Sequence, residues 1–247
     1  MAARPRSRVV SASETPARGP ALSAPRVALL PTPSAVIFDG AYVSGTPGTR
    51  LGGDWYDAVE RADSELAVSI GDVEGRGVEA AFEMSTIRAA LFGLERVCLY
   101  PVTSLQHLDA FIDRTYPDLF VTAFAARYQP ASRRLWYANA GHPAPFVRNE
   151  RGDVRRLFLA DVPLGLGSLR CRTLHVEELS AGDTFVAFTD GLIETTRDIE
   201  AEERRLARAI ADPAFGAAAR PAVWLRAALV DPYPADDVAI LTMRVLR

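Results

Sequence analysis

Acidic side chains stand beside glycines or at the ends of apolar runs in several short turns of this sequence. The turns are Gly52-Gly53-Asp54, Gly71-Asp72-Val73, Thr189-Asp190-Gly191 and Asp236-Asp237-Val238. A single Asp-Gly pair is more often an ordinary turn. Asp72 and Asp190 each follow an apolar run, however, whereas Asp236 and Asp237 precede one. Because strand ends can meet at one edge of a sheet, we expect these carboxylates to converge there.

Carboxylates gathered at one place require a compensating cation, because buried like charges repel one another strongly. Ligand sets made only of oxygen favour the hard ions Mg²⁺ and Mn²⁺ over Zn²⁺. The histidines His107, His142 and His175 are dispersed and lack a paired cysteine motif, so they give no zinc pattern. The acidic turns therefore predict a site for divalent magnesium or manganese.

Other hydrolytic and nucleotide-binding patterns are missing from the sequence. Neither Cys98 nor Cys171 is followed six positions later by arginine, so the thiol phosphatase loop C-x5-R is absent. Both cysteines are interpreted as thiols in or near the core. The stretch GDVEGRG is glycine-rich and opens a helix, as phosphate loops do. The chain contains no lysine, however, so it cannot form the loop G-x-x-x-x-G-K-[ST].

The overall composition is that of a globular domain. The chain has 247 residues, 49% of them hydrophobic, and a net charge of −3. This balance argues against a nucleic-acid partner, because such surfaces usually carry a basic excess. No apolar run reaches the ~18 residues of a membrane span, so no membrane partner is expected. Residues 1–24 are expected to form a disordered arm before one domain at 25–247, in the cytoplasm.

Hydrophobic periodicity predicts the elements that must position the acidic turns. The expected order is strands at 34–43 and 64–73, helices at 78–98 and 104–116, strands within 119–128, 133–141, 144–149, 153–159, 171–179 and 183–191, helices at 199–210 and 221–230, and a strand at 237–245. Most strand connections are too short for a crossover helix, so antiparallel hairpins should dominate. The order predicts an α+β fold of two packed sheets with helix pairs outside them.

Seven motifs occur in the order seen in a known family: GGDWYD, GDVEGRGVEAA, FVTAFAARY, NAGHPAP, PLG, FTDGLIE and DDVAIL. Together they resemble bacterial PPM-type (PP2C-like) serine/threonine phosphatases of the SpoIIE and RsbU group, from about Leu29 to the carboxyl terminus. Each motif is moderately specific, whereas the ordered set is strong. The resemblance implies an α-β-β-α sandwich of two antiparallel sheets flanked by helix pairs, in agreement with the periodicity.

The resemblance also implies two Mg²⁺ or Mn²⁺ ions at the edge of the sandwich. Carried over by position, Asp72 would bridge both ions. Asp190 and Asp236 would bind the first ion, and Asp54 and the backbone carbonyl of Val73 would bind the second. A water bridging the ions would then attack the phosphorus in line, while the ions offset charge on the phosphoryl oxygens.

Asp72 and Asp190 are the residues that this assignment makes catalytic. Asp57 and Asp237 are alternative ligands, or hydrogen-bond acceptors that hold the ligands in place. His142, in NAGHP, could act as a general acid, although a hydrogen-bonded imidazole in a tight turn is the commoner arrangement.

The sequence departs from the family pattern in two places. The loop after the bridging aspartate often reads G-H-G, and here it is Gly75-Arg76-Gly77. Arg76 could bind the substrate phosphate through its planar guanidinium, or it could be a solvated loop arginine. The helical hairpin from Val78 to Tyr116 is short, which could alter regulation, because activating partners act on this hairpin in relatives.

The function that the resemblance implies is a metal-dependent protein serine/threonine phosphatase. Its expected substrate is a phosphorylated STAS-type anti-sigma-factor antagonist, by analogy. The roughly thirty residues before the fold are too few for a sensor domain, so input is expected from a separate regulatory protein, metal or substrate supply, or homodimerisation. The alternative is a catalytically silent protein that binds a phosphoprotein or regulatory partner. Arg76 and the short hairpin favour it, whereas the retained carboxylates argue against it.

Overall fold

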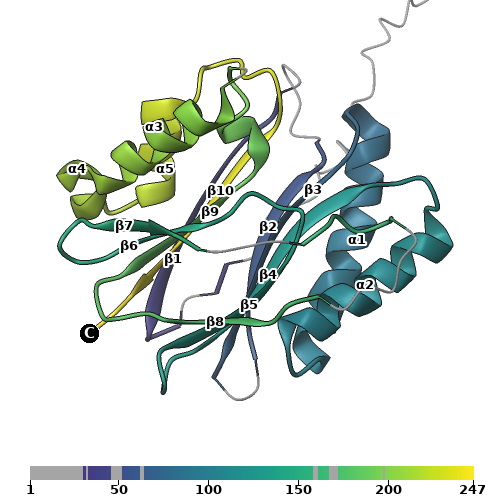
Figure 1. Cartoon of the computed structure of the whole chain (residues 1–247), viewed down its shortest axis with the longest axis horizontal. Coiled ribbons are helices and arrows are strands. Elements are labelled where there is room, and N and C mark those ends of the chain that lie inside the picture. The colour runs from purple at the N-terminus through teal and green to yellow at the C-terminus, as the bar shows by residue number, and fades with distance from the viewer. Residues whose placement is uncertain are drawn as a thin grey trace, which may run out of the picture.

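Two antiparallel sheets of five strands form the centre of the computed structural model (Figure 1). The structure describes residues 30–31, 33–45, 52–61, 64–157, 161–166, 172–196 and 198–247. The expected arm at 1–24 and Cys171 lie outside these residues. Within them, no helix is of the length and apolar character that crossing a membrane requires.

The first sheet has the strand order β1-β10-β9-β6-β7, and the second has the order β2-β3-β4-β5-β8. The strands of the first sheet are β1 (Val36–Val43), β6 (Phe146–Arg148), β7 (Val154–Arg156), β9 (Thr184–Phe188) and β10 (Val238–Val245). Those of the second are β2 (Asp54–Glu60), β3 (Leu66–Val73), β4 (Val121–Gln129), β5 (Arg134–Ala140) and β8 (His175–Glu178).

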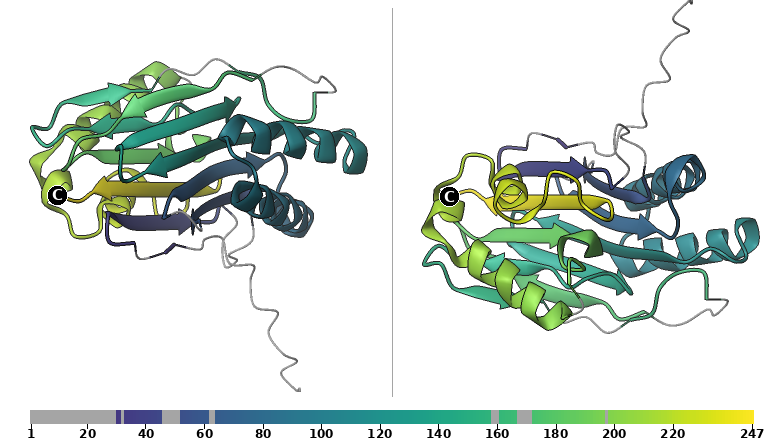
Figure 2. Two further views of the ribbon diagram at one scale, coloured as in Figure 1. Left: turned by 90° about the horizontal axis from the view of Figure 1, so that it is seen from below. Right: turned by 90° about the horizontal axis from the view of Figure 1, so that it is seen from above.

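Helices cover the outer face of each sheet, as the two further views also show (Figure 2). Against the second sheet lie α1 (Gly77–Val97) and α2 (Pro101–Thr115). Against the first lie α3 (Ile199–Ala211) and α5 (Pro221–Leu229), with the short α4 (Pro213–Ala217) between them in sequence. A single 3-10 turn, η1 (Asp190–Leu192), follows β9. The predicted α+β sandwich is therefore confirmed.

Apolar side chains fill the space between the sheets and the space under each helix layer. The central core includes Phe124 and Phe185, whose ring centroids are 5.7 Å apart across the two sheets. Strands β3 and β4 are buried along almost their whole length because one face packs on the other sheet and the opposite face packs on α1 and α2. Such strands appear as nearly continuous apolar runs. The core therefore fixes the strand ends that carry the acidic turns.

Strand β2 is the main element that the periodicity did not predict. Its residues Asp54 to Val59 are buried although they include two aspartates, Asp54 and Asp57. Charged side chains in a strand obscure the apolar pattern, and tertiary contacts overrode it here. Trp55 and Tyr56, which lie between these two aspartates, are also buried.

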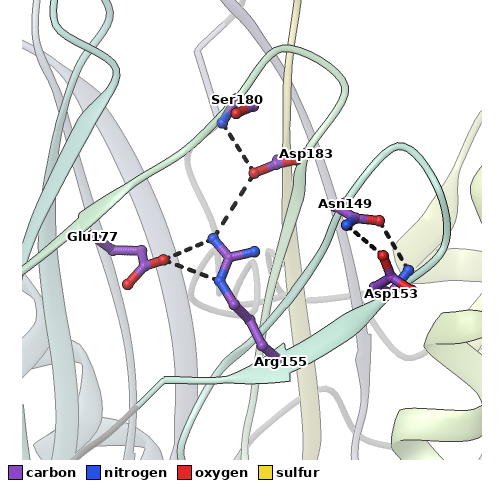
Figure 3. A network of polar contacts seen from close by, with 6 residues as sticks. All are labelled: Asn149, Asp153, Arg155, Glu177, Ser180 and Asp183. Carbon is purple, nitrogen blue, oxygen red and sulfur yellow. Dashed lines mark hydrogen bonds and ion pairs between the residues drawn. The ribbon is translucent and has the colours of Figure 1, made fainter.

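An arginine connects the edge strands of the two sheets (Figure 3). The Nε and Nη2 atoms of Arg155, on β7, donate to Glu177 Oε1 on β8 at 3.0 and 2.7 Å. The same guanidinium lies 3.9 Å from Asp183 Oδ2, which accepts a hydrogen bond from the Ser180 amide. Because β7 and β8 end their respective sheets, this network links the layers along one side of the sandwich.

Candidate active site

The two aspartates of β2 and β3 are direct cross-strand partners. Asp54, the first residue of β2, pairs in register with Asp72, near the end of β3. Asp54 is buried and Asp72 is half-buried. Burial, and next the charge of Asp72, raise the pKa of Asp54 well above its ordinary value. Burial, and next the charge of Asp190, raise the pKa of Asp72 to about 7. A cation bound near this pair would therefore stabilise the ionised form of both carboxylates.

Gly53 lets the backbone come close to this pair. A Cβ atom at residue 53 would lie only 2.3 Å from the Val73 carbonyl oxygen and 2.9 Å from Asp72 Oδ1. The Val73 amide donates to the Gly53 carbonyl at 3.1 Å, which ties the two strand ends together. A side chain at residue 53 would crowd the oxygen atoms expected to act as ligands. Residue 53 is therefore a glycine for steric reasons.

Asp190 and Asp236 come to the same edge from the first sheet. Asp190 opens η1, directly after β9, and is half-buried. Burial raises the pKa of Asp190, and the charges of Glu194 and Asp236 raise it further. Asp236 is exposed, and its Oδ2 lies 3.5 Å from Arg76 Nη2. Charge–charge interactions therefore connect Asp54 with Asp72, Asp72 with Asp190, and Asp190 with Asp236, across both sheets.

Asp237 holds the loops of the site rather than pointing at an open position. Its Oδ1 accepts from the Gly45 amide at 2.8 Å and its Oδ2 accepts from the Gly53 amide at 3.0 Å. Of the two roles predicted for Asp237, these contacts favour that of a hydrogen-bond acceptor supporting the ligands. The neighbouring Asp236 keeps an exposed side chain, so the two adjacent acids differ in role.

Asp57 lies apart from this cluster. It faces α1, where both of its oxygens accept hydrogen bonds from Arg88, at 2.7 Å from Nε and 2.8 Å from Nη2. Successive strand residues point to opposite faces, so residues 54 and 57, three positions apart, face opposite sides of the sheet. The alternative of Asp57 as a metal ligand therefore finds no support in this geometry, which gives the residue a structural ion pair.

His142 is a buried, neutral imidazole in a tight turn. Its Nδ1 lies 2.9 Å from the Thr122 hydroxyl, and its carbonyl accepts from Asn139 Nδ2 at 3.0 Å. Gly141 before it has φ +68°, a conformation that favours glycine. Burial lowers the pKa of His142 to about 3, against an opposing contribution from the Phe188 carbonyl. Of the two interpretations, this supports the turn, because a neutral imidazole has no proton of suitable acidity to donate.

Thr189 is a site residue to which the sequence analysis gave no role. Its hydroxyl donates to Asp54 Oδ2 at 2.6 Å and accepts from the Ala239 amide at 2.8 Å. The residue is fully buried. The available signal was a hydroxyl side chain at the end of an apolar strand, directly before Asp190. That signal is weak, because only the folded structure shows which carboxylate the hydroxyl reaches.

The residues at this edge fit a hard divalent cation. Asp54, Asp72, Asp190, Asp236 and the Val73 carbonyl offer only oxygen atoms, the donor type that Mg²⁺ and Mn²⁺ prefer. Burial, and next the like charges of neighbouring carboxylates, raise the pKa of three of these carboxyls, and a bound cation would offset both effects. Among the described residues, no three histidine, cysteine or acidic side chains are already gathered closely enough to hold one ion.

The sandwich has the fold that solved PP2C-type phosphatase domains share. Residues 62–246 match the family model of stage II sporulation protein E (SpoIIE). The chain belongs to the SpoIIE family, which confirms the resemblance stated from the motifs.

Individual relatives agree with this assignment. The phosphoserine phosphatase RsbU of Bacillus subtilis is 29% identical over 150 residues, which are 60% of this chain and 44% of RsbU. The phosphoserine phosphatase RsbP of the same organism is 23% identical over 154 residues, covering 60% of this chain and 38% of RsbP. The chain thus spans less than half the length of these curated relatives.

Solved structures share the fold. The RsbU and RsbW domains of a Mycobacterium tuberculosis protein superpose with a TM-score of 0.80 and 29% identity, covering 90% of this chain and 63% of that one. The catalytic domain of the phosphatase PstP, solved with 2 manganese ions, gives a TM-score of 0.63 and 16% identity, covering 86% of this chain and 99% of the other. The second likeness shows the fold alone.

Proposed function

We propose that this chain is a metal-dependent protein serine/threonine phosphatase that uses two Mg²⁺ or Mn²⁺ ions. The observation that carries the proposal is the cross-strand pair Asp54 and Asp72, whose electrostatic contacts continue to Asp190 and Asp236 at the same edge. Carboxylates with raised pKa values in such a cluster are typical of functional sites. The membership of the SpoIIE family and the similarity to phosphoserine phosphatases support the same conclusion.

The position of each proposed ligand determines which ion it would bind. Asp72 would be shared by both ions, with Asp190 and Asp236 on the first and with Asp54 and the Val73 carbonyl on the second. Bound there, the ions would supply a nucleophilic water and neutralise charge on the phosphoryl oxygens.

Groups around the ligands complete this assignment. Thr189 orients Asp54 through its 2.6 Å hydrogen bond. Arg76 lies beside Asp236 on an exposed loop, where its guanidinium would bind the phosphate of the substrate. His142 stays neutral and supports the turn near Asp190. The leaving serine oxygen therefore receives its proton from solvent or from another group.

The proposed substrate is a phosphorylated STAS-type anti-sigma-factor antagonist. Two similarities support it: one to RsbU, and one to a solved chain in which an RsbU domain and an RsbW domain occur together. Both fit regulation by partner switching, in which removing one phosphate from an antagonist releases a sigma factor.

The test is hydrolysis of p-nitrophenyl phosphate with Mn²⁺ or Mg²⁺ by the wild type and by Asp72→Ala and Asp190→Ala. We expect metal-dependent turnover by the wild type and a loss of at least about 100-fold in either variant. The exposed Asp118, in the loop before β4, provides the control, and Asp118→Ala should retain wild-type turnover.

Two results would count against the proposal. Turnover by the wild type without metal would remove the ions from the mechanism. Equal inactivity of the wild type and both variants over a wide range of metal concentrations would favour the alternative, a silent member of the fold that binds a phosphoprotein. A screen of phosphorylated antagonist proteins from the same cell then tests the substrate assignment separately.

A further inference from the structure

A cleft of about 370 Å³ lies directly beside the acidic edge. One wall is formed by η1 and the residues after it, including Glu194, and the other by the segment 229–236 that joins α5 to β10. Figure 1 shows that segment together with the chain that follows β9 at the upper edge of the sandwich. Arg76 and Asp236 also line the cleft. The cleft therefore begins where the phosphate of a substrate would lie.

The two walls are fixed relative to the acidic edge. A Cβ atom at Gly191 would lie 2.1 Å from the Asp237 carbonyl oxygen, so η1 packs against the backbone immediately after the segment 229–236. The far wall is anchored by Arg205, whose Nη2 donates to the Leu229 carbonyl at 3.1 Å. A polypeptide bound in this cleft would therefore keep a defined position relative to Asp190 and Asp236.

Tyr233 is the most exposed large hydrophobic side chain among the described residues, at 81%. It stands between Pro232 and Pro234, and the prolines restrict the backbone that carries it. Exposed aromatic residues in a preorganised segment are frequent anchors of protein recognition, because little conformational entropy is lost on binding. The arrangement fits contact with a polypeptide rather than with a small phosphate ester.

Charge is distributed unevenly in the cleft. The guanidinium of Arg76 lies at the Asp236 end, 3.5 Å from that carboxylate. Glu194 and Asp231 are acidic and exposed. A phosphate would therefore bind at the arginine end, and the residues next to it in the substrate would meet negative charge.

We propose that this cleft binds the substrate polypeptide next to its phosphoserine or phosphothreonine, with Tyr233 as the anchor. Asp231 and Glu194 select a basic residue in the flanking sequence. This inference rests on the proposed phosphatase function, and it specifies the substrate class: a phosphoprotein with arginine or lysine close to the phosphorylated residue.

The test compares wild type, Tyr233→Ala and Asp231→Arg on two phosphoserine peptides that differ only in carrying arginine or glutamate in the flanking positions. For Tyr233→Ala we expect KM for the arginine peptide to rise about 10-fold with kcat changed less than about 2-fold. For Asp231→Arg we expect the preference for arginine over glutamate to fall about 10-fold. Hydrolysis of p-nitrophenyl phosphate, which carries no flanking polypeptide, should be unchanged in both.

The control is Tyr100→Ala, which removes a tyrosine exposed at the α1–α2 turn and should change neither KM. An unchanged peptide KM in Tyr233→Ala, or an equal loss on peptide and p-nitrophenyl phosphate, would overturn the proposal. A non-hydrolysable phosphonate version of the arginine peptide, labelled with fluorescein, keeps the test independent of turnover. Weaker binding to Tyr233→Ala than to wild type supports the cleft even if no hydrolysis occurs, and equal binding overturns it.

Discussion

The hydroxyl of Thr189 donates to Asp54 Oδ2 at 2.6 Å and joins the end of β9 to the start of β2. The Thr189 hydroxyl oxygen also accepts a hydrogen bond from the Ala239 amide, at 2.8 Å. Its single proton is therefore directed at Asp54, which fixes one carboxylate oxygen and leaves the other for a ligand role. Thr189 directly follows β9 of the first sheet, and Asp54 opens β2 of the second, so this hydrogen bond spans the sandwich at its acidic edge.

Thr189→Val should weaken metal binding while keeping the shape of the side chain. Loss of a hydrogen bond to a metal ligand typically reduces metal affinity about 10- to 100-fold, and the Ala239 amide also loses its acceptor, at a cost of about 1–3 kcal/mol of stability. Mn²⁺ titration calorimetry and denaturant unfolding measure the two effects. Thr189→Ser keeps the hydroxyl and should restore most of the affinity; equal affinity in all three proteins would contradict the prediction.

The stability of the metal-free protein should fall as the pH rises from about 4 to above 7. The pKa of Asp72 is raised to about 7 and that of Asp54 is raised well above its ordinary value. The folded state then holds more protons than the unfolded state in this range, so folding becomes less favourable with increasing pH. Each unit of pKa difference corresponds to about 1.4 kcal/mol. Urea unfolding at several pH values checks this, and Asp72→Asn should flatten the dependence.

Asp57→Asn should destabilise the fold and leave metal binding intact. The buried pair with Arg88 would lose one partner, and breaking such a pair typically costs about 3–5 kcal/mol. The thermal midpoint is therefore expected to drop, while the Mn²⁺ affinity of the folded protein stays within about 2-fold of wild type. A loss of affinity comparable to that of Asp54→Asn would instead restore Asp57 as a ligand.

His142→Gln should retain activity with an unchanged pH profile between pH 5.5 and 8. Because burial lowers the pKa of His142 to about 3, the imidazole is already neutral throughout this range. The glutamine amide can still pair with Thr122, so stability should fall by no more than about 1–2 kcal/mol. Measurement of kcat against pH decides the matter: if the variant removed an acidic or basic limb, His142 would be a proton donor after all.

Arg76→Ala should raise KM for a phosphorylated substrate without lowering the Mn²⁺ affinity. The Arg76–Asp236 pair is exposed, with side-chain accessibilities of 70% and 53%, and exposed pairs contribute at most about 1 kcal/mol. Its loss therefore leaves stability nearly unchanged. Steady-state kinetics with p-nitrophenyl phosphate and with inorganic phosphate as inhibitor test the phosphate contact; unchanged values for both would mean a solvated loop arginine.

The sequence predicted the sandwich well because its central strands are covered on both faces. Strands such as β3 and β4 leave a continuous apolar signal, and the helices of the α1–α2 hairpin leave a regular stripe. Strand β2 was missed because Asp54, Asp57 and Glu60 interrupt its pattern. The hydrogen-bond partners of the two buried aspartates, Thr189 and Arg88, come from distant segments. The short α4 was also missed, since five residues are too few to show a period.

The candidate site was partly predictable for a related reason. The acidic turns stand at strand ends, which sequence can recognise, and the antiparallel order brings those ends to one edge. The distinction between Asp236 and Asp237 depends on the amides of Gly45 and Gly53, which lie far away in the chain. Strand alternation turns Asp57 away from Asp54, but its partner Arg88 on α1 is defined only in the folded chain. Contacts between distant segments leave no trace in local composition.

The proposed ligands come from both layers of the sandwich, Asp54 and Asp72 from β2 and β3, and Asp190 and Asp236 from beside β9 and β10. An ion held by Asp72 and Asp190 would thus cross-link two sheets whose other contacts are mainly apolar. Metal binding would stabilise this end of the sandwich in addition to preparing the site for catalysis. Amide exchange at the first residues of β2 and β10 should then slow together when manganese is added. The exchange rates at these residues would therefore indicate whether the metal site is occupied.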